Sequence, residues 1–218
     1  MGTRNLTCVY IDGQYKIGQY GQWDGYPEGQ GRTALQFLHK YNPNKKRNWA
    51  KFVKKLRALD LDQKKIEEIC QKTYKELGAD DSGFVNMDIA CAFKRKFPQV
   101  DRDMGANILQ YVVDSDDGLM VHNDPSFALD SLFCEWAYVV DVDKGTFEVY
   151  KGFNNTPLTE ADRFKFLETE ASLKESNQYR RPGEKWYYAI KLCKEYKLTE
   201  LPTHKQFIAD FKRDDDEE

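Results

Sequence analysis

Long apolar segments are missing from this sequence. No run in the 218 residues approaches the ~20 consecutive apolar residues that a membrane-spanning helix needs. The first residues, MGTRNLTCVYIDG, have no small-residue cleavage site of the secretory type, and a strand-like pattern begins at once. The sequence therefore predicts a cytoplasmic protein with no membrane partner.

Cysteine and histidine are few and scattered. The cysteines are Cys8, Cys70, Cys91, Cys134 and Cys193, and no two of them form a CxxC pair. Three histidines are too few for a His-rich zinc site, and the acidic run at 114–118 lacks the glycine and glutamate spacing of a calcium loop. We therefore expect reduced thiols, with Cys70 and Cys91 on apolar helix faces, and neither a metal nor another cofactor.

An excess of positive charge is also missing. The chain has 33 basic and 36 acidic residues, and this net charge of −3 argues against a nucleic-acid partner. The exception is KKRNWAKFVKKLR at 45–57, which has seven basic residues and no acidic one. Such a segment could bind phosphates or an anionic membrane surface. We favour a helix that packs through Trp49 and Phe52 with its lysines in water, because the flanking segments and the tail are acidic.

Two β-hairpins are the clearest local structures. At 6–20, two β-rich runs flank Asp12-Gly13, a dipeptide that favours hairpin turns because both positions tolerate positive φ. At 133–153, two further runs flank Asp143-Lys144-Gly145. A strand is also expected within 186–198. The sequence thus predicts an antiparallel sheet built from two hairpins and a C-terminal strand.

Helical periodicity dominates the middle of the chain. Helices are predicted at 32–41 and 49–56, after an N-cap at Asp60 or Asp62, after Asn86, and from Asp101 to Val112. Thr203 and Gln206 form a capping box for a last helix, while residues 170–183 read as a loop. We therefore predict an α+β fold in which helices cover the sheet. It would be one domain at 1–213, with a helical insertion at about 32–115 and an acidic tail at 214–218.

The segment GQYGQWDGYPEGQG, residues 18–31, has a composition that neither a helix nor a strand favours. Glycine lets a ligand approach the backbone, and tryptophan and tyrosine offer flat faces for stacking. A helix beginning at Gly31–Arg32 would add backbone N–H groups that favour an anion. We predict that this segment forms a pocket wall, with an ordered structural loop as the alternative.

Eight residues in or near this segment are candidates for chemistry. Asp24 and Glu28 could form an acid–base pair, for which two carboxylates ~5–10 Å apart are needed. Ligand-binding roles are expected for Arg4, Gln19, Gln22, Trp23, Tyr26 and Gln30. The rings would stack on the ligand, the amides would hydrogen-bond in either direction, and Arg4 would meet negative charge. His122, in a loop ending His-Asn-Asp, is a further candidate base, although a turn position is the favoured interpretation.

TRNLTCVYIDGQYKIGQYGQWDGYPEGQG, residues 3–31, resembles the start of a family of uncharacterised microbial and phage-type proteins. These begin with a TR-hairpin and carry a near-identical QYGQWDGYPxGQG segment. WAYVVDVDKGTFEVYKGFN, residues 136–154, is typical of the same family. The resemblance covers about fifty residues and implies no activity.

A second resemblance is to the N-terminal nucleophile hydrolases of the proteasome type. Those enzymes begin with a threonine and a hairpin, and here Thr3 precedes the hairpin and Tyr20-Gly21-Gln22 falls near the following turn. The resemblance implies a free N-terminal amine that activates its own hydroxyl. The sequence departs from this pattern, because removing Met1 leaves Gly2 first, and Cys8 would require processing within a strand.

Three functional hypotheses follow. The leading one is binding of a small polar or nucleotide-like ligand at residues 19–31. The second is a hydrolase, acting through Asp24 and Glu28 or through an N-terminal nucleophile. The third is a protein-interaction factor that presents Trp23 and Tyr26 to a macromolecular partner.

Overall fold

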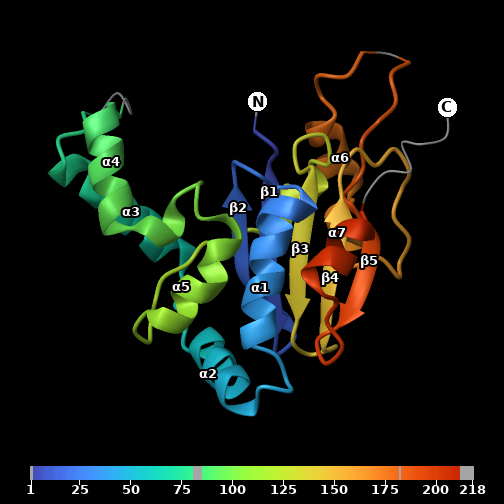
Figure 1. The fold of residues 1–218 in the computed structure, drawn as a ribbon. Helices are drawn as coiled ribbons and strands as arrows, with labels where there is room; N and C mark the ends of the chain where they lie inside the picture. Colours follow the sequence, from blue (N-terminus) through green and yellow to red (C-terminus); the bar gives the residue numbers. More distant parts are fainter. Residues whose placement is uncertain (1, 81–84, 182, 212–218) are drawn as a thin grey trace.

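A five-stranded sheet forms the centre of the fold (Figure 1). The computed structural model describes residues 2–80, 85–181 and 183–211. In spatial order the strands are β2 (Gln14–Gly21), β1 (Asn5–Ile11), β3 (Trp136–Asp141), β4 (Thr146–Lys151) and β5 (Lys191–Lys197). Most helices lie between β2 and β3 in the chain, so the predicted α+β class is confirmed.

Both predicted hairpins are present. β1 and β2 pair antiparallel from Asn5 opposite Gly21 to Ile11 opposite Gln14. In the turn, Asp12 and Gly13 have φ values of 54° and 75°, the left-handed backbone that a tight hairpin turn requires. β3 and β4 form the second antiparallel hairpin, and β5 pairs antiparallel with β4.

The two hairpins join through a parallel pair, which corrects the prediction of a purely antiparallel sheet. β1 and β3 run in the same direction, with Thr7 opposite Tyr138 and Val9 opposite Val140. Parallel neighbours need a long crossover connection, and the largely helical residues 22–135 provide it. Alternation within each strand does not reveal this direction, because the direction depends on the return path of the whole insertion.

Seven α-helices occur among the described residues. They are α1 (Arg32–Lys40), α2 (Lys46–Arg57), α3 (Gln63–Glu76), α4 (Met87–Lys96), α5 (Ile108–Asp114), α6 (Glu170–Ser176) and α7 (His204–Ala209). The side chains of Asp62, Asn86 and Thr203 accept backbone N–H groups at the starts of α3, α4 and α7. The Thr203 cap is as predicted, Asp62 is one of the two caps expected for α3, and α4 begins directly after the expected Asn86, because capping depends on residues that are close in sequence.

Two predictions of local structure are wrong. The helix expected from Asp101 begins only at Ile108, after a 3₁₀ turn at Gly105–Asn107. Gly105 has a φ of +47°, which lies outside the helical region and prevents an earlier start. Residues expected as loop form α6, which buries none of its side chains. No apolar stripe therefore marks this helix in the sequence.

Each face of the sheet carries an apolar core. On one face Val9, Ile17 and Phe147 belong to a core that includes buried residues of α1, α2, α5 and α7, and α1 and α7 lie over the strands in Figure 1. On the other face Leu6 and Val139 belong to a second core, which residues from 128 to 190 complete. The central strands β1, β3 and β4 are thus covered on both sides, whereas the edge strand β5 is exposed.

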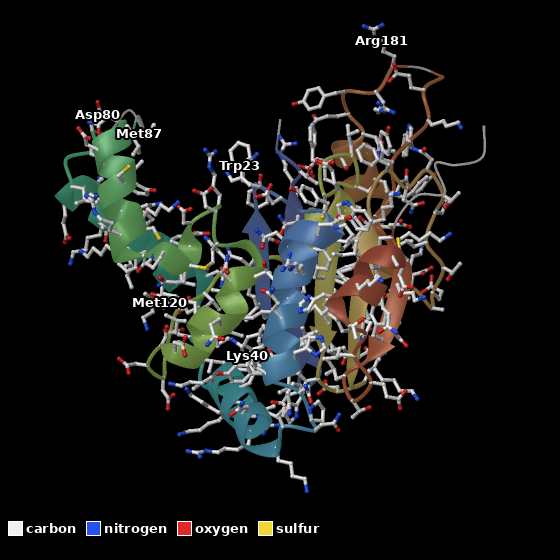
Figure 2. The ribbon with its side chains drawn as sticks, in the orientation of Figure 1. Trp23, Lys40, Asp80, Met87, Met120 and Arg181 are labelled. Atoms are coloured by element: carbon white, nitrogen blue, oxygen red, sulfur yellow. The ribbon has the colours of Figure 1, made fainter. Side chains whose placement is uncertain are left out.

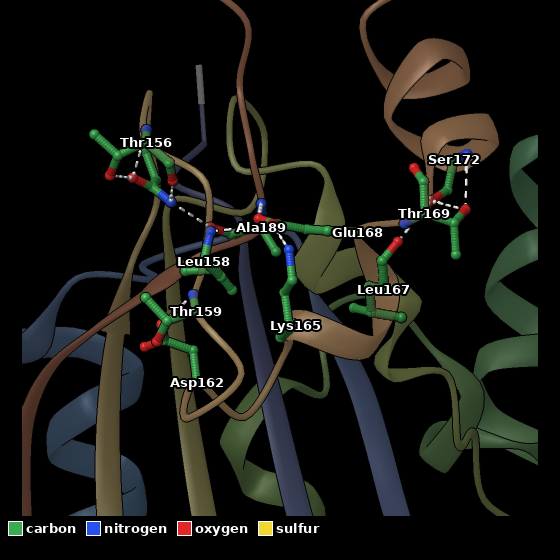
Figure 3. A network of polar contacts seen from close by, with 11 residues as sticks. Thr156, Leu158, Thr159, Asp162, Lys165, Leu167, Glu168, Thr169, Ser172 and Ala189 are labelled. Atoms are coloured by element: carbon green, nitrogen blue, oxygen red, sulfur yellow. Dashed lines mark hydrogen bonds and ion pairs between the residues drawn. The ribbon is translucent and has the colours of Figure 1, made fainter.

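The segment at 154–169 covers part of the second face. The carboxylate of Glu168 accepts the backbone N–H groups of Leu158 at 3.0 Å and Ala189 at 3.1 Å, and it pairs with Lys165 (Figure 3). The Glu168 side chain is fully buried. A single carboxylate therefore ties three stretches of chain together where regular secondary structure is sparse.

Helices α3 and α4 form an arm that extends away from the sheet (Figure 1). Tyr74 and Phe93 stack between them with ring centroids 4.1 Å apart. Cys91 on this arm is exposed, which corrects the prediction that it faces an apolar core, and Cys70 is only half-buried. No helix in the described part of the chain has the length and apolar character needed to cross a membrane. The predicted acidic tail lies outside the described residues.

Candidate functional site

The segment 18–31 begins in the last residues of β2, and its helical structure begins at Pro27, earlier than predicted. A short π-helical turn at Pro27–Gly31 runs directly into α1. The backbone N–H of Arg32 donates to the carbonyls of Gly29 and Pro27. The anion-binding helix start predicted at Gly31–Arg32 is therefore absent, because this N–H group is already used.

Glycine is required where this segment packs against the start of β1. The N–H of Gly25 donates to the carbonyl of Thr3 at 2.9 Å. A Cβ atom at position 25 would lie 2.7 Å from that oxygen and 2.8 Å from the carbonyl oxygen of Arg4. Both distances are shorter than real Cβ contacts, so a larger residue would push the segment off the strand. The glycine here serves close packing.

The three candidate glutamines bind other groups of the protein, and two of them bind its backbone. Gln19 is buried, and its amide nitrogen donates to the carbonyls of Tyr20 and Asp101. Gln22 accepts the Tyr20 hydroxyl at 2.5 Å. Gln30 accepts the N–H of Ala106 at 2.8 Å and donates to the carbonyl of Trp23. Gln19 and Gln30 thus hold the segment against residues 101–106.

Trp23 is 46% exposed and lies between the α3–α4 arm and the upper end of the sheet in the view of Figure 2. Its indole N–H donates to Asp103 at 2.9 Å. Asp103 also pairs with Lys94 of α4, and this ion pair lowers the pKa of the carboxyl group. Asp103 and Lys94 line a hollow of about 420 Å³ between the α3–α4 arm and residues 100–103. Trp23 is therefore tied to the edge of this hollow.

A separate pocket of about 280 Å³ lies where β2 meets the loop after α5. It is lined by Gly18, Tyr20, His122, Asp124 and Phe127, and we call it the Gly18 pocket. Two backbone hydrogen bonds build it: Gly18 N–H donates to His122 at 3.1 Å, and Asp124 N–H donates to Gly18 at 3.2 Å. A Cβ atom at position 18 would lie 2.6 Å from the Asp124 nitrogen, so only glycine allows this approach.

The Gly18 pocket combines aromatic, imidazole and carboxylate groups. Tyr20 and Phe127 meet edge to face with ring centroids 5.0 Å apart. Burial lowers the pKa of His122, although the Asp124 charge opposes the shift. His122 is therefore neutral near pH 7, with one donor and one acceptor nitrogen. The ring also hydrogen-bonds the backbone of Val100, which leaves its other nitrogen as an acceptor. One oxygen of Asp124 accepts the N–H of Ser126 at 2.9 Å.

Another pocket, of about 270 Å³, borders a buried charge cluster. Tyr10, Tyr15, Phe166 and Arg163 contribute to its lining, together with Asp141, Asp143 and Lys144. Arg163 is only 8% exposed and pairs with Asp141 and Glu148, which are 2% and 1% exposed. Sequence reasoning missed this cluster. The available signal was Glu148, a charged residue that shares one face of a buried strand with Thr146 and Tyr150.

The other candidate residues lie outside these pockets. Asp24 and Glu28 are exposed, and Asp24 accepts the Tyr26 hydroxyl at 3.2 Å. Neither carboxylate lines the Gly18 pocket, the pocket of about 270 Å³ beside Arg163 or the hollow beside α4. The Arg4 guanidinium stacks on Phe133, 4.6 Å from the ring centroid.

Comparisons with protein families, curated proteins and solved structures found no match to this chain. The resemblance of residues 3–31 to a phage-type family therefore stays a prediction. Among the residues that the structure describes, no group of three or more histidine, cysteine, aspartate or glutamate side chains is arranged to hold a metal ion.

Proposed function

We propose that the protein binds a small, planar, polar ligand of the nucleoside type in the Gly18 pocket. The observation that carries this proposal is that a neutral imidazole and a carboxylate line one pocket beside an aromatic pair. A heterocyclic base would stack on Tyr20 or Phe127 and hydrogen-bond to His122 and Asp124. The volume of about 280 Å³ lies just below the usual range of ligand pockets, which limits the ligand to one small heterocycle with its sugar.

Charge decides which part of a nucleotide would enter. Asp124 is a carboxylate, and His122 brings no compensating positive charge because burial lowers its pKa. A phosphate would meet repulsion from Asp124, whereas an exocyclic amino group would donate to it. The pocket therefore favours a neutral base or nucleoside over a free phosphate.

The test is a titration of adenosine, guanosine, cytidine and uridine, followed by isothermal calorimetry. At least one nucleoside should bind, and Tyr20→Ala should abolish binding while the fold is kept. Tyr179→Ala is the matched control, because Tyr179 is 89% exposed and distant in sequence from the pocket. Equal loss of binding in both variants, or no binding of any nucleoside, would overturn the proposal.

A protein-interaction role is the second candidate. Trp23 and Tyr26 are 46% and 40% exposed, and exposed aromatic side chains often anchor protein interfaces. Trp23→Ala should then abolish capture of a specific partner without changing nucleoside binding. The hydrolase alternative has less support. Asp24 and Glu28 are exposed away from the pockets, and burial raises the pKa of the Cys8 thiol far above neutrality.

A further inference from the structure

Helix α2 carries an unusual excess of positive charge. Residues 45–57 include seven basic side chains and no acidic one. The apolar side of the helix packs inward, with Phe52 and Leu56 fully buried and Trp49 and Val53 packed against the same core. Most of the basic side chains consequently occupy the outer side, although the Lys55 side chain is only 17% exposed. Figure 2 shows nitrogen-tipped side chains of α2 extending into solvent beyond Lys40.

The two halves of this outer side differ. In the C-terminal half, Lys54 and Lys55 pair with Asp117, and Arg57 pairs with Asp12. In the N-terminal half, Lys45, Lys46, Arg47 and Lys51 are exposed and form no ion pair with any residue that the structure describes. We call these four residues the α2 basic face. No described residue compensates their charges, although the protein as a whole is acidic.

The helix itself works against these charges. Lys45 is the N-cap of α2 and provides no side-chain cap, and the first turn contains no acidic residue. The N-terminus of a helix carries partial positive charge, so cations there are unfavourable. Both features would be relieved by a bound anion, which would accept the free N–H groups and neutralise the side chains.

We propose that the α2 basic face binds the phosphate backbone of a nucleic acid without reading its bases. The four cations span six residue steps, about 9 Å of helix. A duplex presents about five phosphate charges over that length. Contact with a membrane is disfavoured, because the large apolar side chains of α2 pack against the core and Ala50 is the exposed apolar residue of the helix.

Counterion release sets the expected salt dependence. Neutralising about four phosphates gives a slope of about −3.6 for log K against log salt on duplex DNA. The affinity should therefore fall about 150-fold between roughly 50 and 200 mM NaCl. The net charge of −3 will keep binding weak at physiological salt.

The test is fluorescence anisotropy of a labelled mixed-sequence duplex and its scrambled counterpart, across this salt range. We expect equal affinity for both duplexes, the steep salt slope, and loss of binding in Lys46→Glu/Arg47→Glu/Lys51→Glu. The control with the same change of charge is Lys191→Glu/Lys194→Glu/Lys197→Glu on the exposed strand β5, which should retain binding. A Lys46→Gln/Arg47→Gln/Lys51→Gln variant, checked by circular dichroism, repeats the test with a milder change.

Equal loss of affinity in the α2 and β5 variants would overturn the proposal, as would a flat salt dependence. Binding to phosphatidylserine vesicles without binding to the duplex would also overturn it and assign the face to membranes. The outcome is independent of the Gly18 pocket, because adenosine should not compete with the duplex.

Discussion

Replacing Arg163 with methionine should destabilise the protein strongly and reverse the pH dependence of its stability. Arg163 donates to the two oxygens of Glu148 at 2.7 and 2.8 Å and pairs with Asp141. Glu148 also accepts the hydroxyl of Tyr150 at 2.6 Å. Burial raises the pKa of Glu148, but Arg163 and the hydroxyl groups outweigh it, so the pKa lies below its ordinary value.

The magnitude follows from burial. Removing one partner of a buried ion pair costs about 3–5 kcal/mol, because it leaves uncompensated charge in the interior. That is a large part of the roughly 5–15 kcal/mol by which most domains are stable. Arg57→Met is the matched control: Arg57 makes the same kind of pair with Asp12, but the side chains are 58% and 43% exposed. That substitution should cost no more than about 1 kcal/mol.

The pH signature is the sharper part of this prediction. In the native protein the pKa of Glu148 is lowered. The ionised Glu148 therefore stabilises the fold above the pKa that glutamate has in the unfolded chain, and this stabilisation is lost as pH falls through the lower pKa of the folded protein. In Arg163→Met the buried carboxylates retain protons that the unfolded chain releases. Stability then falls with rising pH by about 1.4 kcal/mol per unit for each retained proton.

Urea unfolding of both proteins from about pH 3.5 to 7 measures these slopes, because the native loss lies below the ordinary glutamate pKa and the variant's lies above it. A loss below about 1 kcal/mol for Arg163→Met, together with an unchanged slope, would refute the reasoning. It would mean that water reaches the cluster and solvates the carboxylates.

Four further changes test other parts of the structure. Thr7→Val should raise the free energy of unfolding by about 1 kcal/mol, because the buried Thr7 hydroxyl has no hydrogen-bond partner among the described residues; a decrease would indicate that an ordered water binds it. Gly18→Ala should lower the thermal midpoint, since its Cβ would meet the Asp124 backbone, and an unchanged midpoint would contradict the close approach. His122→Gln should remove a loss of stability seen as pH falls below about 6.5, where the unfolded chain gains a proton that the buried imidazole resists. Thr203→Ala should cost about 1 kcal/mol in urea unfolding by removing the α7 capping box.

The parts of the fold that were predicted correctly are local. The turn at Asp12-Gly13 and the caps at Asp62 and Asn86 each depend on residues within a few positions of one another. The parallel pairing of β1 with β3 depends on how a long helical insertion returns, and α6 has no apolar face to produce a periodic signal. Predicting the parallel pair and α6 requires knowledge of contacts between residues that are far apart in the sequence.

The candidate site shows the same division. Composition identified residues 18–31 as unusual, but the partners of Gln19 and Gln30 lie at residues 101–106, about eighty positions away. A glutamine that could hydrogen-bond to a ligand looks the same in sequence as one that hydrogen-bonds to a backbone group far away in the chain. Tyr20 and His122 come together only because Gly18 pairs with the loop after α5.

Nuclear magnetic resonance of the protein mixed with each of adenosine, guanosine, cytidine and uridine tests the Gly18 pocket most directly. Intermolecular nuclear Overhauser effects should connect the base protons of at least one nucleoside to the rings of Tyr20 and Phe127. Contacts to Trp23 and Tyr26 instead, or no contacts with any nucleoside, would contradict binding in this pocket.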